Sequence, residues 1–167
     1  ELKVSGYFNV SYACALSSGT AALKCALKAL GVKSGDEVIT QSFNFIATIE
    51  AIVDCGAKPV ICNIDDNLHM RMDDLKRRIT NKTKAIIIVH MLGMGGQIEE
   101  IMKIGKEFNI PIIEDNCEAI GAKFKDNYLG TIGDIGVMSF DHGKMIACGE
   151  GGMVVCNNKS DYEILKS

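Results

Sequence analysis

The sequence predicts an α/β fold with a mostly parallel sheet and helices on both of its faces. Segments with strand-like and helix-like periodicity alternate along the chain and are joined by short turn-rich links. Residues Lys84–His90 also contain an uninterrupted apolar run, which is typical of a strand covered on both faces. Alternation at this spacing indicates βαβ units, in which helices connect neighbouring parallel strands.

The predicted helices follow from apolar residues at helical spacing. In Ala21–Leu30 the apolar side chains share one helical face, and Gly31 supplies a C-terminal stop. Asp73–Ile79 carries acidic residues early and basic residues late, as the helix dipole favours. The other predicted helices are Phe45–Cys55, Ile98–Phe108 and a helix start at Lys159–Lys166.

The predicted strands are short apolar runs bounded by turn residues. In chain order they are Tyr12–Leu16, Glu37–Thr40, Pro59–Ile64, Lys84–His90, Pro111–Glu114, Val137–Phe140 and Met153–Cys156. Between Gly121 and Gly136 the chain is rich in turn residues, and Asp126-Asn127 is the predicted hairpin turn.

Length and composition indicate one globular domain over residues 1–167. Lys and Arg number 18 against 21 Asp and Glu, which leaves a net charge of -3 and no reason to expect nucleic acid as a partner. No secretory signal is visible and no apolar stretch approaches the roughly 20 residues that span a bilayer, so we expect a cytoplasmic protein without a membrane partner. Because the chain opens on Glu1 and stops at Ser167 inside a predicted helix, we expect it to be part of a longer protein.

The seven cysteines do not indicate a metal site. Their number is odd, no Cys-x-x-Cys pair occurs, and most lie inside apolar segments. A zinc site needs closely spaced ligands, so we expect reduced, buried thiols and no bound metal.

In an open parallel sheet, ligands bind beyond the carboxyl ends of the strands, so the segments that follow strands are the candidate sites. The first is Ser17–Ala22, where hydroxyls and a glycine precede a helix. Free N–H groups at a helix start bind phosphate, although the same residues are also favoured as a plain N-cap. The second is Asp115, at the end of a buried strand. Its carboxylate could bind a protonated ring nitrogen. It could equally be a solvated acid at the strand end or a cap for a following helix.

The third candidate segment is Ser139–Gly152, in which Lys144 lies five residues after a strand-end serine. A lysine shielded from water is a nucleophile for aldehydes, whereas most lysines in hairpins simply face solvent. An anion cradle, a carboxylate for a ring nitrogen and a lysine for an aldehyde are together the three contacts that pyridoxal phosphate requires. All three are predicted at strand ends of one sheet, which favours this cofactor over the separate interpretations.

The motifs around these residues resemble those of the DegT/DnrJ/EryC1/StrS family. They are Ser18–Leu23, Gly35–Thr40, Ser42–Thr48, Ile113–Asp115 with Gly121-Ala122, Gly130–Asp134, and Ser139-Phe140 through Lys144 to Gly149–Gly152. They follow the family's order from about residue 10 to the end. The resemblance implies a fold type I aminotransferase large domain, with the family's C-terminal small domain missing from this chain.

The resemblance also implies a role for seven residues. Gly19 and Thr20 would bind the cofactor phosphate, with a further hydroxyl from Ser139. Phe45 would stack on the pyridine face, Asp115 would pair with the pyridine nitrogen, and Glu118 stands nearby where the family more often has Gln or His. Lys144 would form the Schiff base with the cofactor aldehyde. Gln41 replaces a proline common in the family, and we expect no effect from that change.

The implied activity is transfer of an amino group from an amino acid, by the family's precedent glutamate, to a keto sugar linked to a nucleotide. A homodimer in which a neighbouring subunit completes the cofactor site is implied as well. Sugar dehydratases of the same fold carry histidine at the lysine position, so Lys144 favours amino transfer, and the nearby His142 makes the register a point to test. A catalytically inactive relative and a non-catalytic nucleotide-sugar-binding domain are the alternatives. The Gly-x-Gly-x-x-Gly turn expected of a dinucleotide-binding domain is absent.

Overall fold

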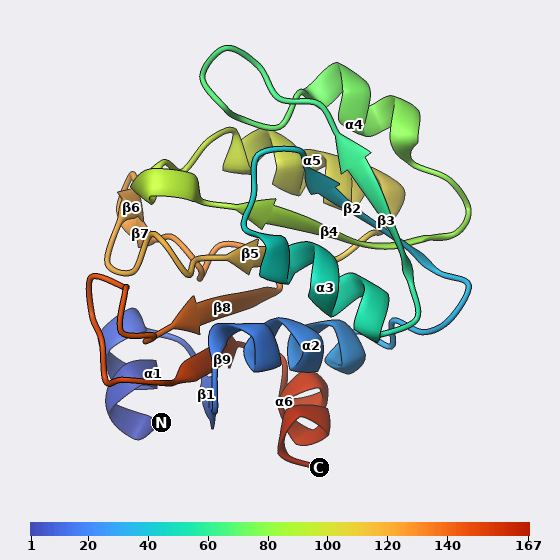
Figure 1. The fold of residues 1–167 in the computed structure, drawn as a ribbon. Helices are drawn as coiled ribbons and strands as arrows, with labels where there is room; N and C mark the ends of the chain where they lie inside the picture. Colours follow the sequence, from blue (N-terminus) through green and yellow to red (C-terminus); the bar gives the residue numbers. More distant parts are fainter.

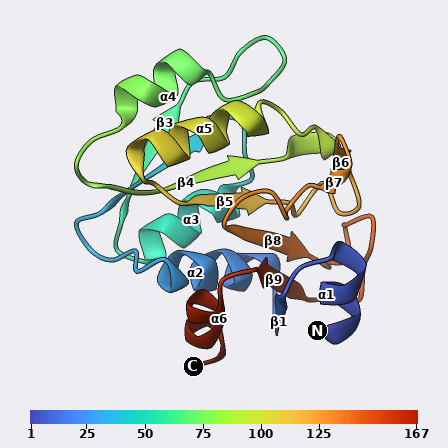
Figure 2. The same cartoon turned by 180° about the vertical axis from the view of Figure 1, so that it is seen from behind.

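The computed structural model describes residues 1–167 as one seven-stranded sheet with helices on both faces (Figures 1 and 2). The strand order is β1-β9-β8-β5-β4-β2-β3. The strands are β1 Tyr12–Leu16, β2 Glu37–Gln41, β3 Lys58–Cys62, β4 Thr83–Val89, β5 Ile112–Asp115, β8 Ile135–Ser139 and β9 Gly152–Cys156. A separate hairpin pairs β6 Lys123-Phe124 with β7 Asn127-Tyr128.

The sheet is parallel except at one strand. The neighbouring pairs from β3 through β2, β4 and β5 to β8 are parallel, whereas β9 is antiparallel to both β8 and β1. The prediction of a mostly parallel sheet is therefore confirmed. Six strands consequently bring their carboxyl ends to the same edge of the sheet, and this edge carries the site described below.

Helices cover the two faces in two groups. Helices α2 (Gly19–Ala29), α3 (Ile46–Asp54) and α6 (Lys159–Lys166) lie on one face, seen in front in Figure 1. Helices α1 (Leu2–Phe8), α4 (Met72–Arg78) and α5 (Ile98–Phe108) lie on the other, seen in front in Figure 2. This arrangement explains why the central strands are apolar at successive positions.

The cores on the two faces follow from the alternation of side chains along each strand. In β4, Ile87 packs in the core beneath α2 and α3, while its neighbours Ile86 and Ile88 pack against α5. In β5, Ile113 and Ile112 divide in the same way. Burying each such side chain contributes about 1.5–3 kcal/mol, so both faces hold the strand ends rigidly.

The structure differs from the sequence-based expectations at several boundaries. Helix α1 and the short 3-10 helix Met91–Gly93 were not predicted, and β3 ends at Cys62 rather than Ile64. The hairpin turn consists of Lys125 and Asp126, one residue earlier than predicted, because Phe124 pairs with Asn127. Lys125 takes a positive φ of 54°, as the favoured two-residue hairpin turns require. Lysine is not among the residues typical of that conformation, so the sequence did not indicate this turn position.

All seven cysteines are unpaired, as expected, and only Cys148 is exposed. None of the helices combines the length and apolar character needed to cross a bilayer.

Candidate active site

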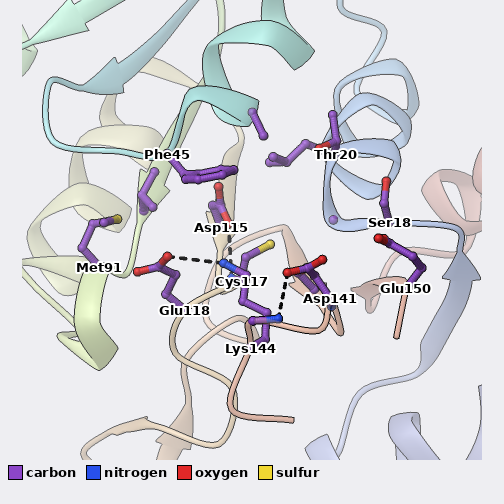
Figure 3. A pocket seen from close by; sticks show the side chains of 16 residues that line it. Ser18, Thr20, Phe45, Met91, Asp115, Cys117, Glu118, Asp141, Lys144 and Glu150 are labelled. Carbon is purple, nitrogen blue, oxygen red and sulfur yellow. Dashed lines mark hydrogen bonds and ion pairs between the residues drawn. The ribbon is translucent and has the colours of Figure 1, made fainter. Parts of the chain in front are cut away.

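A cavity of about 340 Å³ opens at the carboxyl edge of the sheet (Figure 3). Val89, Asp115 and Ser139 are the last residues of β4, β5 and β8, and all three line it. Ser18, just beyond β1, lines it as well. The cavity therefore lies where ligands bind in parallel α/β sheets.

All of the residues singled out from the sequence line this one cavity. They are Gly19, Thr20, Phe45, Asp115, Glu118, Ser139 and Lys144. They come from four regions of the chain, namely the start of α2, the β2–α3 link, the end of β5 with its following turn, and the end of β8 with the β8–β9 loop. The fold thus assembles the residue types at one place, while their individual roles remain predictions.

The start of α2 is built as a capped helix that also faces the cavity. Ser18 is the N-cap, and its hydroxyl accepts a hydrogen bond of 3.1 Å from the Ala21 N–H. A Cβ on Gly19 would lie only 2.8 Å from the Cβ of Ser139, so a glycine is needed for α2 to begin this close to the end of β8. The first N–H groups of a helix have no partner inside it, which leaves this turn able to bind an anion.

Asp115 is held by donors from two directions. Its side chain is buried, and Thr48 of α3 donates a hydrogen bond of 2.8 Å to Oδ2. The Cys117 N–H donates to Oδ1 at 3.2 Å. Burial, together with the charge on Asp115, raises the pKa of the Cys117 thiol well above its ordinary value, so this cavity-lining cysteine stays neutral.

Lys144 reaches the cavity from the loop between β8 and β9. Its Nζ lies 3.3 Å from Oε1 of Glu118 and 5.4 Å from the centre of the Phe45 ring. The loop is anchored where the Cys148 N–H donates to the Phe140 carbonyl at 3.0 Å. Figure 3 shows Lys144 and Glu118 directed toward each other below Asp115.

The structure resolves the register of this loop. The His142 side chain is 84% exposed and pairs with Asp141, with 2.9 Å between Nδ1 and Oδ2. His142 does not line the cavity, whereas Lys144, with only 18% of its side chain exposed, does. A lysine rather than a histidine therefore occupies the loop position that faces the cavity.

Phe45 lies at the mouth of the cavity, more than half exposed, as the residue that precedes α3. The link that carries it is held by Gln41, whose Oε1 accepts from the Val89 N–H at 3.2 Å and whose Nε2 donates to the Phe43 carbonyl at 3.0 Å. Asn44 also donates to the Gln41 carbonyl. Gln41 therefore supports this link, and the expectation that glutamine in place of the family's proline has no effect stays a prediction.

The sequence reasoning missed three residues that line this cavity, Cys117, Asp141 and Glu150, and it missed Thr48, which contacts the lining residue Asp115 from outside the cavity. Four carboxylates and one lysine line the cavity, so its own side chains are acidic in sum. The Gly143 N–H holds the pKa of one of them, Asp141, below its ordinary value.

The model of the DegT/DnrJ/EryC1/StrS aminotransferase family matches residues 1–167. The GDP-perosamine synthase of Escherichia coli O157:H7 is 44% identical over 164 residues, which cover 98% of this chain and 45% of that protein.

Two solved structures extend the comparison. The aminotransferase from Psychrobacter cryohalolentis superposes with a TM-score of 0.96 at 36% identity, covering 99% of this chain and 42% of that chain. The E. coli GDP-4-keto-6-deoxy-D-mannose-3-dehydratase, solved with bound hydrated PLP, gives 0.92 at 33% identity, covering 99% of this chain and 44% of that chain. The chain thus spans less than half the length of these relatives, and it belongs to the DegT/DnrJ/EryC1/StrS aminotransferase family.

Proposed function

We propose that residues 1–167 are the cofactor-binding domain of an enzyme that uses pyridoxal phosphate to transfer an amino group to a keto sugar linked to a nucleotide. The amino donor in this proposal is an amino acid, glutamate by family precedent. One observation carries the proposal: the Lys144 amine, the buried Asp115 carboxylate and the N-terminus of α2 all face the same cavity. If any one of the three lay outside this cavity, a purely structural role for it, such as a helix cap or a solvent-facing side chain, would be favoured instead.

The donor set fits the cofactor. A phosphate at the start of α2 would meet the N–H groups of Gly19 and Thr20 and the hydroxyls of Thr20 and Ser139. The close approach of Gly19 to Ser139, which a Cβ would prevent, brings these donors together. Since the cavity's own side chains are acidic in sum, backbone N–H groups and hydroxyls would hold the phosphate in place of side-chain cations. A volume of about 340 Å³ lies in the range typical of ligand sites.

When bound, pyridoxal phosphate supplies an aldehyde that captures amines and a ring that withdraws electrons. Asp115 would hold the proton on the ring nitrogen, and Phe45 would cover one face of the ring. Lys144 would hold the cofactor covalently, and its free amine would be the base that accepts the proton leaving the donor α-carbon. Glu118, whose Oε1 lies 3.3 Å from Nζ, would hold the Lys144 side chain in the cavity.

The substrate class rests on relatives. GDP-perosamine synthase is named for an amino sugar attached to a nucleotide. The dehydratase relative raises the question of amino transfer against dehydration, and the exposed position of His142 favours amino transfer, because the residue facing the cavity is then Lys144. A homodimer that completes the site remains part of the proposal. Light scattering of the protein at its native length tests the dimer.

The test is a borohydride trap on the protein at its native length. After incubation with pyridoxal phosphate, reduction and digestion, mass spectrometry identifies which lysine carries the pyridoxyl group. We expect one adduct on Lys144, lost in Lys144→Ala and kept in Lys58→Ala, which removes an exposed lysine paired with Glu37. Labelling scattered over many lysines, or absent from the parent protein, would contradict the proposal.

The substrate is tested separately. The loaded protein is incubated with glutamate and GDP- or UDP-linked 4-keto sugars, and the products are analysed by mass spectrometry. An amino sugar with equimolar 2-oxoglutarate supports amino transfer. A deoxygenated keto sugar without a lasting change in amine content would instead assign the chain to the dehydratases.

A further inference from the structure

A buried hydroxyl behind the cavity, that of Thr48, has no role in the mechanism proposed above. Thr48 lies in the first turn of α3, is fully buried, and does not line the cavity. Its Oγ1 nevertheless donates a hydrogen bond of 2.8 Å to Oδ2 of Asp115, which does line the cavity. Thr48 therefore stands directly behind a carboxylate that faces the ligand.

We infer that Thr48 is a positioning residue that sets the orientation of the Asp115 carboxylate and stabilises its ionised form for a protonated ring nitrogen. This inference rests on the proposed function, since it assumes that such a ring binds in the cavity. The hydrogen bond joins α3 to the end of β5 across 67 positions of sequence, so it depends on how the helix packs on the sheet. Donation to an ionised carboxylate is stronger than a neutral hydrogen bond and favours the charged form.

The geometry gives each carboxylate oxygen one protein donor. Oδ2 accepts from Thr48, and Oδ1 accepts from the Cys117 N–H at 3.2 Å. These two bonds together fix the plane of the carboxylate, and each oxygen keeps capacity for a further donor.

The chain offers a matched control for the hydroxyl. Thr40 of β2 is also fully buried, but its Oγ1 has no hydrogen-bond partner. Thr48→Val and Thr40→Val thus make the same change in shape at two buried sites, and only the first removes a hydrogen bond. Thr48→Ser keeps the hydroxyl and removes a methyl group instead.

The experiment loads each variant, at the native length of the protein, with pyridoxal phosphate labelled with ¹⁵N in the ring. We expect Thr48→Val to weaken cofactor binding about tenfold, equal to about 1.4 kcal/mol, because a hydrogen bond to a charged group is lost. We also expect its ¹⁵N signal to move toward the unprotonated position. Thr48→Ser should restore both values, and Thr40→Val should leave both unchanged.

The outcomes separate this inference from the proposed function. If the parent protein gives a protonated ring signal and a Lys144 adduct while Thr48→Val matches it, the role of Thr48 is overturned and the proposed function stands. Equal losses in Thr48→Val and Thr40→Val would also overturn it, since they would reflect general packing. A parent protein without a Lys144 adduct would contradict the proposed function and the inference together. Denaturation midpoints are recorded for all variants, and Thr48→Ala replaces Thr48→Val if the valine variant does not fold.

Discussion

The two faces of the sheet differ sharply at the end of β5, where adjacent residues Glu114 and Asp115 are both buried carboxylates. Glu114 faces the α5 side, where its Oε2 lies 2.8 Å from His90 Nε2. It also accepts N–H donors from Gly130, Ile132 and Gly133 at 2.9, 2.6 and 2.5 Å. Asp115 faces the α3 side, where the protein supplies only Thr48 and the Cys117 N–H.

The comparison shows how one strand end serves two purposes. Glu114 is enclosed by donors of its own chain, so it fastens the loop after β7 to the sheet and does not line the cavity. Asp115 has fewer donors and lines the cavity, which leaves its oxygens able to accept from a ligand. Alternation of side chains along the strand separates the two tasks.

The largest effect is expected from Glu114→Ala. The substitution leaves three backbone N–H groups and the buried His90 without their acceptor. Each buried donor left without its acceptor costs about 1–3 kcal/mol, so we expect a large fall in the denaturant midpoint or no folded protein. Urea unfolding followed by circular dichroism measures this, and an unchanged midpoint would show that Glu114 has no structural role.

In contrast to Glu114→Ala, the substitution Asp115→Asn should abolish most of the activity and leave the stability of the fold nearly unchanged. An amide cannot supply the negative charge that the proposed function needs at the ring nitrogen, and we expect amino transfer to fall about 10²–10³-fold. The amide oxygen can accept from the Cys117 N–H while the amide NH₂ donates to the Thr48 hydroxyl, so the free energy of unfolding should stay within about 1 kcal/mol of the parent value. Turnover with a saturating amino donor provides the comparison. Full activity in this variant would remove Asp115 from the mechanism.

A third buried carboxylate, Asp74 of α4, lies away from the cavity. Its contribution to folding stability depends on pH and serves as a comparison for the two carboxylates of β5. Donation from Arg78 and from the Asn63 N–H lowers its pKa to about 2 from an ordinary value of 3.8. Because the folded value is depressed, its contribution is complete above about pH 4 and is lost as pH falls toward 2. We expect Asp74→Asn to cost about 1–2 kcal/mol at pH 7, with the difference from the parent shrinking near pH 3.

The stability difference between Asp74→Asn and the parent is measured by urea unfolding at pH 7, 5 and 3, and cofactor binding is recorded at pH 7. A deficit that stays constant down to pH 3 would contradict the assignment of the pH dependence to Asp74. A loss of cofactor binding would contradict its separation from the site.

The smallest effect is expected at Gln41, which supports the cavity without lining it. Gln41→Leu leaves the Val89 N–H without its acceptor, at a cost of about 1–2 kcal/mol. Since this contact holds the link that carries Phe45, the Michaelis constant should rise severalfold while turnover changes little. Identical kinetics and stability in Gln41→Leu would show that the Gln41 contacts do not support the link that carries Phe45.

Much of the fold was predictable because periodicity is a local property. The apolar run in β4 and the helical spacing in α2 and α5 indicated these elements correctly. Helix α1 was missed because Glu1 provides no side-chain cap and Gly6 lies in its interior. The antiparallel direction of β9 was not predictable, because a strand's pattern of apolar residues does not record its direction.

The sequence by itself determined the fold class, the family and the residue types that meet at the carboxyl edge. It did so because strand ends can be located from local patterns, and the carboxyl ends of parallel strands share one edge. Only the tertiary structure decided that Lys144 rather than His142 faces the cavity, that Thr48 supports Asp115, and that Glu114 does not line the site. These outcomes depend on how helices and loops pack on the sheet, and such contacts join residues that are distant in sequence and carry no local signal.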